Sequence, residues 1–227
     1  MDLLDLPLFP LGNVVYPGFG VELHIFEPRY QALLADCVRG SGRFGIVGIR
    51  QGIEVGGGAA PYSVGTLVQI TELAKLLDGH YYLAAGGLER IQLSDLDATG
   101  KPYLRGRARL WPDDPAPMPS AALQARAGDL FNRYLAGLVK ASGSDTSDWG
   151  VSLPLALPTD PRLLSWLIAA LIQVPPAEKQ ALLEAPAPGP RLELAAELLG
   201  RELTLMRTTG AAPAPNPATL RGSFSDN

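Results

Sequence analysis

The chain has 227 residues, of which 47% are hydrophobic and 19% are charged. This balance is typical of a globular protein that buries a core, and it excludes a disordered or fibrous chain. The net charge of −4 gives no general attraction to nucleic acid or to an anionic membrane surface, so both are disfavoured as partners.

The compartment is inferred from what the sequence lacks. No run of apolar residues is long enough to span a membrane, and the start, MDLLDLPLFPLG, carries acids where a secretory signal carries Lys or Arg. Cys37 is the only cysteine, so the chain cannot form an internal disulfide. We therefore expect a cytoplasmic protein.

Residues 1–111 are predicted to form a β-rich unit. Apolar and polar residues alternate over 21–25, as in a strand with one buried face. Further strands are predicted at 43–50, 65–73, 80–85, 88–93 and 103–111. Phe9-Pro10 and Pro17-Gly18 are expected where the chain turns, since Pro fixes φ and Gly permits positive φ.

One helix is expected within this unit, from Pro28 to about Gly40, with Gly40 as a left-handed C-terminal residue. Its apolar residues recur at helical spacing and form one stripe that can pack on a sheet: Tyr30, Leu33, Leu34, Cys37 and Val38. Residues 51–63 contain too many glycines for a regular element, and we expect a mobile loop there.

Residues 112–119, PDDPAPMP, are predicted to be a Pro-rich linker, and 120–208 a helical subdomain. Helices are expected to begin after Ser120, at Pro161 after an Asp160 N-cap, at Pro176, and at Pro190. The connection 141–159 is long and contains Trp149, so we expect it to dock on the surface. Residues 209–227 are Pro- and Ala-rich and are predicted to be a disordered tail.

Three sequence blocks near the start occur in a fixed order: LPLFPL at 6–11, VVYPG at 14–18 and LHIFEPRY at 23–30. They are followed by FGIV at 44–47, GTL at 65–67, GLERI at 87–91 and PYL at 102–104, and then by DPRL at 160–163, EKQALLE at 178–184 and RLE at 191–193. This series resembles the N-terminal domain of Lon-type proteases over most of the chain, with the tail outside it.

The resemblance implies an α+β fold, in which a PUA-like, partly closed β-barrel is followed by an α-helical bundle. In full-length Lon proteases this region helps to recognise unfolded or tagged substrates. The only Gly-Lys pair, Gly100-Lys101, is followed by Pro102, so the sequence has no phosphate-binding loop. It also leaves no room after Arg207 for ATPase and protease domains, and we therefore expect no enzyme activity and no cofactor.

A binding module with this resemblance is expected to contact unfolded or exposed protein segments, or a folded protein partner, and a homodimer is also possible. Glu27 can instead cap the helix with its carboxylate and Arg29 can brace a neighbouring loop, while packing is the simpler role for Phe9 and Phe26. The candidate contact residues are Phe9, Phe26, Glu27, Arg29, Tyr30, Tyr62 and Trp149.

An RNA-binding surface is the alternative interpretation. Arg105, Arg107 and Arg109 alternate with small residues, so in a strand their guanidinium groups share one face, flanked by Tyr103 and Trp111. The acidity of the chain argues against RNA, and pairing with carboxylates on adjacent strands explains such a face equally well.

A hydrolase that uses Cys37 as nucleophile and His24 as base is a third possibility. Cys37 lies on the apolar stripe of its predicted helix, which favours a small core residue. Two His and one Cys, far apart in sequence, do not make a tetrahedral zinc set unless carboxylates join them. We expect neither a catalytic residue nor a structural metal.

Overall fold

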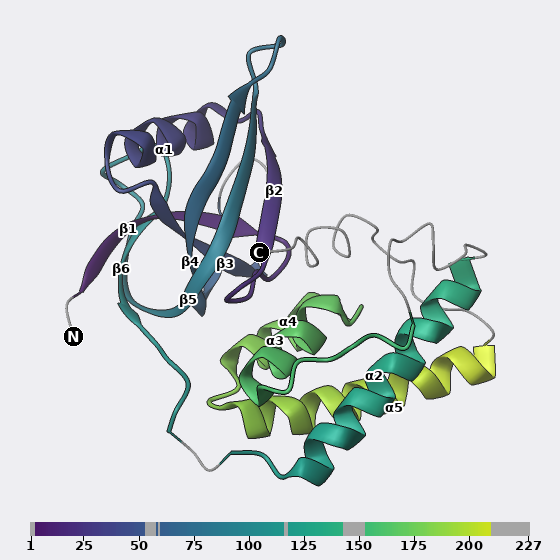
Figure 1. Cartoon of the computed structure of the whole chain (residues 1–227). Coiled ribbons are helices and arrows are strands. Elements are labelled where there is room, and N and C mark those ends of the chain that lie inside the picture. Colours follow the sequence, from purple (N-terminus) through teal and green to yellow (C-terminus); the bar gives the residue numbers. More distant parts are fainter. Residues whose placement is uncertain (1–2, 53–57, 59, 116–117, 143–152, 210–227) are drawn as a thin grey trace. The chain divides into compact units, whose positions relative to one another are not determined.

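The computed structural model describes residues 3–52, 58, 60–115, 118–142 and 153–209. These residues form two compact units that divide between Pro112 and Asp113. The first unit is rich in strands and the second is helical (Figure 1). The predicted α+β class is therefore confirmed, and each unit is described separately below.

The described part of the first unit holds a six-stranded sheet and one helix. The strands lie in the order β2-β5-β4-β3-β1-β6, and β6 also pairs with β5. Hydrogen bonding therefore runs in a closed circuit from β5 through β4, β3, β1 and β6 back to β5. The elements in chain order are β1 (Leu4–Leu11), β2 (Gly20–Ile25), α1 (Pro28–Arg39), β3 (Arg43–Gln51), β4 (Ala60–Lys75), β5 (Tyr81–Asp97) and β6 (Arg105–Leu110).

Strands β2 and β6 share one edge of the long strand β5. β2 pairs antiparallel with residues from Tyr81 to Gly86, and β6 pairs with residues from Ile91 to Asp97. β2 stands at the end of the strand order, so its outer edge has no strand partner among the described residues.

Several predicted strand boundaries are wrong. β1 is a strand, although a turn was expected at Phe9-Pro10; the strand tolerates its two prolines between parallel β3 and antiparallel β6. The predicted strands at 80–85 and 88–93 are one strand, β5; its pairing with β4 shifts register near Gly87 but continues on both sides. Of the predicted mobile loop at 51–63, residues 60–63 belong to β4 and Gln51 to β3, while 53–57 and 59 lie outside the described residues.

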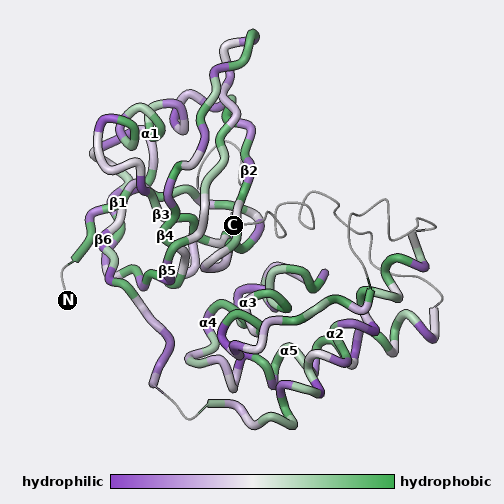
Figure 2. The backbone as a smooth tube through the Cα atoms, in the orientation of Figure 1, coloured by the Kyte–Doolittle hydropathy of each residue, from purple (hydrophilic) through white to green (hydrophobic). Residues whose placement is uncertain are grey.

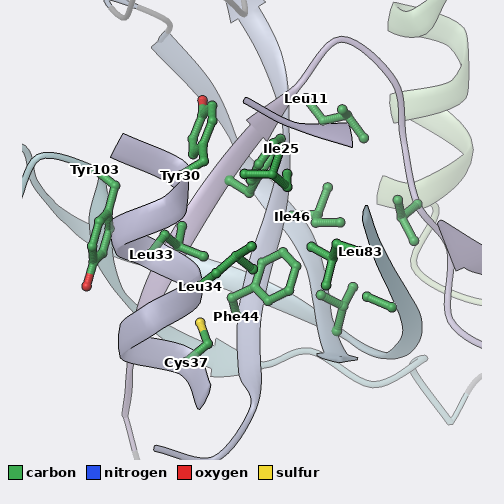
Figure 3. Close-up of a cluster of buried hydrophobic side chains, with 14 residues drawn as sticks. Leu11, Ile25, Tyr30, Leu33, Leu34, Cys37, Phe44, Ile46, Leu83 and Tyr103 are labelled. Carbon is green, nitrogen blue, oxygen red and sulfur yellow. The ribbon is translucent and has the colours of Figure 1, made fainter. Parts of the chain in front are cut away.

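Helix α1 packs its predicted apolar stripe into the core of the first unit (Figure 3). Tyr30, Leu33, Leu34 and Cys37 are buried, whereas Val38 at the stripe's edge is 60% exposed. Gly40 does not adopt the predicted left-handed conformation, since its φ is −103°. Gly42 does so instead, with φ +70°, and its N–H donates to the carbonyl of Cys37 at 2.9 Å.

A polar cluster fastens the outer side of α1. The Asp36 carboxylate accepts a hydrogen bond from the Tyr103 hydroxyl and lies 3.0 Å from Lys101 Nζ. These two contacts, with a third from Arg39, lower the pKa of Asp36 to about 2. Tyr103 is buried and precedes β6, so the prediction that it flanks the arginines within the strand is wrong.

The second unit contains four described helices: α2 (Ala121–Ser142), α3 (Pro161–Leu171), α4 (Pro176–Glu184) and α5 (Pro188–Thr209). The predicted starts of the first three are confirmed; Ser120 Oγ accepts from Leu123 N–H, and Asp160 Oδ1 accepts from Arg162 N–H. α5 begins before the predicted Pro190 and contacts α2, α3 and α4. None of the described helices has the length and hydropathy that a membrane span requires.

Candidate functional site

The corner between β2 and α1 carries the most specific motif of the sequence, Glu27-Pro28-Arg29-Tyr30. The Arg29 guanidinium donates to both carboxylate oxygens of Glu27, at 3.0 and 3.2 Å, and lies over the Tyr30 ring at 4.3 Å. The Glu27 carboxylate makes no cap hydrogen bond to the helix, so its predicted capping role is wrong. The carboxylate is held by Arg29 instead.

The aromatic candidates separate into buried and exposed groups. Phe9 and Tyr30 are each 4% exposed, and their rings stack with centroids 4.1 Å apart. They belong to the core beneath the corner, as the packing role of Phe9 and the apolar stripe that contains Tyr30 predict. Phe26 is 44% exposed and stands at the surface between β2 and α1, so the packing role predicted for it is wrong. Tyr62 lies half-buried on β4, away from the end of β2, and Trp149 lies outside the described residues.

Two further exposed apolar side chains lie in the turn that joins β4 to β5. Leu77 is fully exposed and Leu76 is 37% exposed. The Phe26 ring lies 6.2 Å from the ring of His80, which ends the same turn. At this far end of the hairpin, hydrophobic residues stand next to hydrophilic ones (Figure 2). We call Phe26, Leu76 and Leu77 the tip surface.

Backbone hydrogen bonds fix the turn that presents these leucines. The Leu76 N–H donates to the His80 carbonyl at 2.9 Å, and the Gly79 N–H donates to the Leu76 carbonyl at 3.1 Å. Gly79 has φ +86°, which favours glycine at this position. Leu77 is thus held away from the core by a defined turn.

Both histidines of the chain lie beside the tip surface. The rings of His24 and His80 are 5.1 Å apart, and His80 Nδ1 lies 3.0 Å from an oxygen of Asp78. One ligand atom from each of His24, Asp78 and His80 lies within 4.8 Å of the others. The sequence left open that a carboxylate could join the two histidines, and Asp78 takes this place in the structure.

The arginine face of β6 forms as the alternation predicts. Gly106 and Ala108 are buried, while Arg107 and Arg109 are exposed and Arg105 is half-buried. Carboxylates lie on both neighbouring strands: Arg105 pairs with Asp5 of β1, and the register places Asp95 of β5 and Asp5 opposite Arg107. Arg109 donates to the Gln92 side chain. These neighbours favour the structural interpretation of the face over RNA binding.

The Cys37 thiol is poorly suited to catalysis. It is 3% exposed, and its Sγ contacts the Arg43 carbonyl at 3.6 Å. Burial is the larger cause, and the charge of Asp36 the smaller one, of a rise in the Cys37 pKa to about 11. His24 lies on β2 and pairs with Tyr82, not with Cys37. The predicted alternative of a Cys37–His24 hydrolase is left without a reactive thiolate.

The tip surface is the feature that sequence reasoning missed. Its signal was present, because Leu76-Leu77-Asp78-Gly79 places two leucines directly before a dipeptide typical of tight turns. These residues lie between the predicted strands at 65–73 and 80–85. If 65–73 and 80–85 pair as one hairpin, both leucines lie in the turn at its end.

The family comparison covers most of the chain. Residues 5–201 match the model of the ATP-dependent protease La (LON) substrate-binding domain. The chain is 31% identical over 210 residues to a Lon protease of Anaeromyxobacter dehalogenans (strain 2CP-C) and 32% identical over 204 residues to Lon protease 2 of Myxococcus xanthus. In both cases the match covers 89% of this chain and 24% of the relative. The chain therefore spans about a quarter of the length of these relatives.

Solved structures agree with this match. The crystal structure of a Lon N-terminal domain protein from Xanthomonas campestris has a TM-score of 0.63 and 25% identity, covering 87% of this chain and 98% of that one. The N-terminal domain of the Mycobacterium avium complex Lon protease has a TM-score of 0.61 at 18% identity, covering 86% and 98%, and supports the fold alone. The matched region is non-catalytic and contains no ATPase or protease domain. With a family model matched from residue 5 to residue 201, the chain belongs to the LON substrate-binding domain family.

Proposed function

We propose that this chain is a non-catalytic module that binds exposed apolar segments of other proteins. The tip surface supports the proposal: Phe26, Leu76 and Leu77 present large apolar side chains to solvent at one end of the first unit. Transfer of exposed apolar side chains from water into contact with a partner lowers the free energy of the system. Membership of a substrate-binding family supplies the expected class of partner, a polypeptide.

The outer edge of β2 provides a second means of contact. β2 ends directly before Phe26 of the tip surface, and no strand pairs with its outer edge among the described residues. An extended polypeptide can add to such an edge through main-chain hydrogen bonds, with alternate side chains directed to one face. Both features suit an unfolded segment, because a folded partner has fewer free backbone groups and fewer exposed apolar side chains.

The architecture that the resemblance implies is part of the same proposal. We infer that the closed circuit of strands is the PUA-like, partly closed barrel and that helices α2 to α5 form the bundle. On this account the first unit holds the contact surface. The competing occupant of the tip surface is a second copy of this chain. In that case, substitution of Leu77 would change the oligomeric state.

Substitution at the tip surface tests the proposal. Leu77→Lys places a charge on a fully exposed side chain and leaves the core untouched. Fluorescence anisotropy with a labelled, permanently unfolded polypeptide should then show binding weakened about tenfold or more, since a buried Leu contributes roughly 1.5–3 kcal/mol. Phe26→Ser should act in the same direction.

The matched control is Leu163→Lys, which charges a leucine that is 55% exposed on α3 of the second unit. It should leave the affinity unchanged. Equal affinity of the wild type, Leu77→Lys and Phe26→Ser would contradict the assignment of binding to the tip surface. Sedimentation velocity of the same proteins separates loss of client binding from loss of a dimer.

A further inference from the structure

Two histidines and one aspartate converge at the end of the β4–β5 hairpin. The sequence contains only two histidines, and both take part. One ligand atom from each of His24, Asp78 and His80 lies within 4.8 Å of the others. The cluster combines parts of the chain that are distant in sequence, so the fold itself brings the three side chains together.

The strand register explains why the imidazoles meet. His24 of β2 lies opposite Tyr82 of β5, and His80 comes two residues before Tyr82. Residues two apart along a strand direct their side chains to the same face, and diagonal neighbours on adjacent strands are within reach of aromatic rings. The observed ring separation of 5.1 Å follows from this register.

The contact between His80 and Asp78 is arranged as two ligands of one ion would be. His80 Nδ1 is 3.0 Å from Asp78 Oδ2, yet this enclosed nitrogen forms no hydrogen bond with any described residue. Asp78 Oδ1 accepts the His80 backbone N–H at 3.0 Å, which orients the carboxylate. Two ligands bound at about 2.1 Å to one metal ion lie roughly 3.0–3.4 Å apart.

The donor set selects the class of ion. Imidazole nitrogen suits zinc, copper, nickel and cobalt, whereas Ca²⁺ and Mg²⁺ prefer sites made of oxygen. Three protein ligands leave at least one position for water on an ion of this class. His24 is exposed, so rotation of its side chain toward the other two ligands meets little resistance.

We infer that His24, Asp78 and His80 bind one divalent transition-metal ion of the zinc class. The ion joins the end of β2 to the turn that carries Leu76 and Leu77. Binding should therefore stabilise the first unit, because an ion that binds only the folded state shifts the unfolding equilibrium. The inference is independent of polypeptide binding, and its test uses no polypeptide.

The test uses the full chain without a polyhistidine tag. Co²⁺, a spectroscopic substitute for Zn²⁺, is titrated while its visible absorption is followed, and Zn²⁺ affinity is measured by competition with a chromophoric chelator. One Co²⁺ per chain is expected, displaced by Zn²⁺. His24→Ala, His80→Ala and Asp78→Asn should each weaken binding about tenfold or more, since even residues outside the ligand set change metal affinity by 10–100-fold.

Asp97→Asn is the matched control, because Asp97 is also an exposed aspartate of the first unit, at the end of β5, whose oxygen accepts backbone N–H groups. It should bind metal like the wild type. The melting temperature of the wild type should rise with Zn²⁺, and those of the two histidine variants should not. Absence of a Co²⁺ spectrum and of Zn²⁺ competition, or wild-type affinity in both histidine variants, would overturn the inference.

Discussion

The guanidinium of Arg191 lies 2.5 Å from a carboxylate oxygen of Asp113, with the two side chains 0% and 3% exposed. Arg191 also donates to the carbonyls of Leu182 and Ala185, and its guanidinium lies 3.2 Å from the centre of the Trp166 ring. One side chain thus joins the start of the second unit to α3 and to the connection between α4 and α5.

Arg191→Met should destabilise the second unit by about 3 kcal/mol, because it removes the buried cation and leaves Asp113 with the exposed Arg162, 3.4 Å away. Urea unfolding followed by circular dichroism measures the loss. The control is Arg133→Met, which breaks an exposed pair with Asp129 on α2 and should cost less than about 0.5 kcal/mol. Similar losses of unfolding free energy in the two variants would show that the buried pair contributes no more to stability than the exposed pair.

Lys179 gives the second unit a defined pH dependence. It is 6% exposed, its Nζ donates to the Ala170 carbonyl at 3.0 Å, and burial lowers its pKa from 10.5 to about 8. Between these two values the unfolded chain holds the proton more tightly than the folded chain does. The contribution of Lys179 to the free energy of unfolding therefore rises with pH above 8, by about 1 kcal/mol between pH 7 and 9.

Comparison with Lys179→Met isolates this effect. The free energy of unfolding of the wild type, relative to the variant, should increase between pH 7 and 9. Above pH 9 the raised pKa values of Cys37 and Tyr134, about 11 and about 12, act in the opposite direction in both proteins. Parallel pH curves for the two proteins would refute the assignment.

Gly87 is required by a close approach of two segments. A Cβ atom there would lie 2.3 Å from the Tyr16 carbonyl oxygen, and its backbone exchanges hydrogen bonds with Gly18 and Phe19. Gly87→Ala should therefore cost about 2–3 kcal/mol in the free energy of unfolding of the first unit, because backbone must move. Chemical denaturation of the variant measures this cost.

Two other glycines separate crowding from backbone conformation. Gly18 has φ +82° and open space around its Cβ position, so Gly18→Ala should cost only about 1–2 kcal/mol. Gly200 lies in α5 with nothing near its Cβ position, and Gly200→Ala should stabilise the second unit by up to about 1 kcal/mol. A Gly87→Ala variant as stable as the wild type would mean that the two segments are not in contact.

The Cys37 thiol should react slowly in the folded protein. At pH 8 a pKa of about 11 leaves little thiolate, and burial blocks access. A chromogenic disulfide reagent should therefore modify the native chain at least about a hundredfold more slowly than the urea-unfolded chain. Equal rates would restore the hydrolase alternative that Cys37 and His24 suggested.

Local signals in the sequence predicted the helices well. Pro28, Asp160-Pro161 and Pro176 mark helix starts because proline suits the first turn, and the apolar stripe of α1 predicts its buried face. The motif series also identified the family. These features depend on residues close together in the chain, where spacing alone carries the information.

Features that depend on strand pairing could not be predicted from the sequence. β1 contains two prolines and became visible as a strand only through its neighbours β3 and β6. The meeting of His24 with His80 and the burial of Arg191 against Asp113 result from register and packing between distant segments. The exposure of Leu76 and Leu77 likewise depends on the pairing of β4 with β5, which no short motif such as Glu27-Pro28-Arg29-Tyr30 indicates.

Binding of a labelled, permanently unfolded polypeptide and of its folded counterpart, each titrated with the wild-type protein at low and high salt, tests the central claim most directly. Fluorescence anisotropy should show binding of the unfolded chain alone. The affinity should be similar at both salt concentrations, because contact with Phe26, Leu76 and Leu77 is apolar. Absence of binding to the unfolded chain, or equal binding of the folded one, would contradict the account.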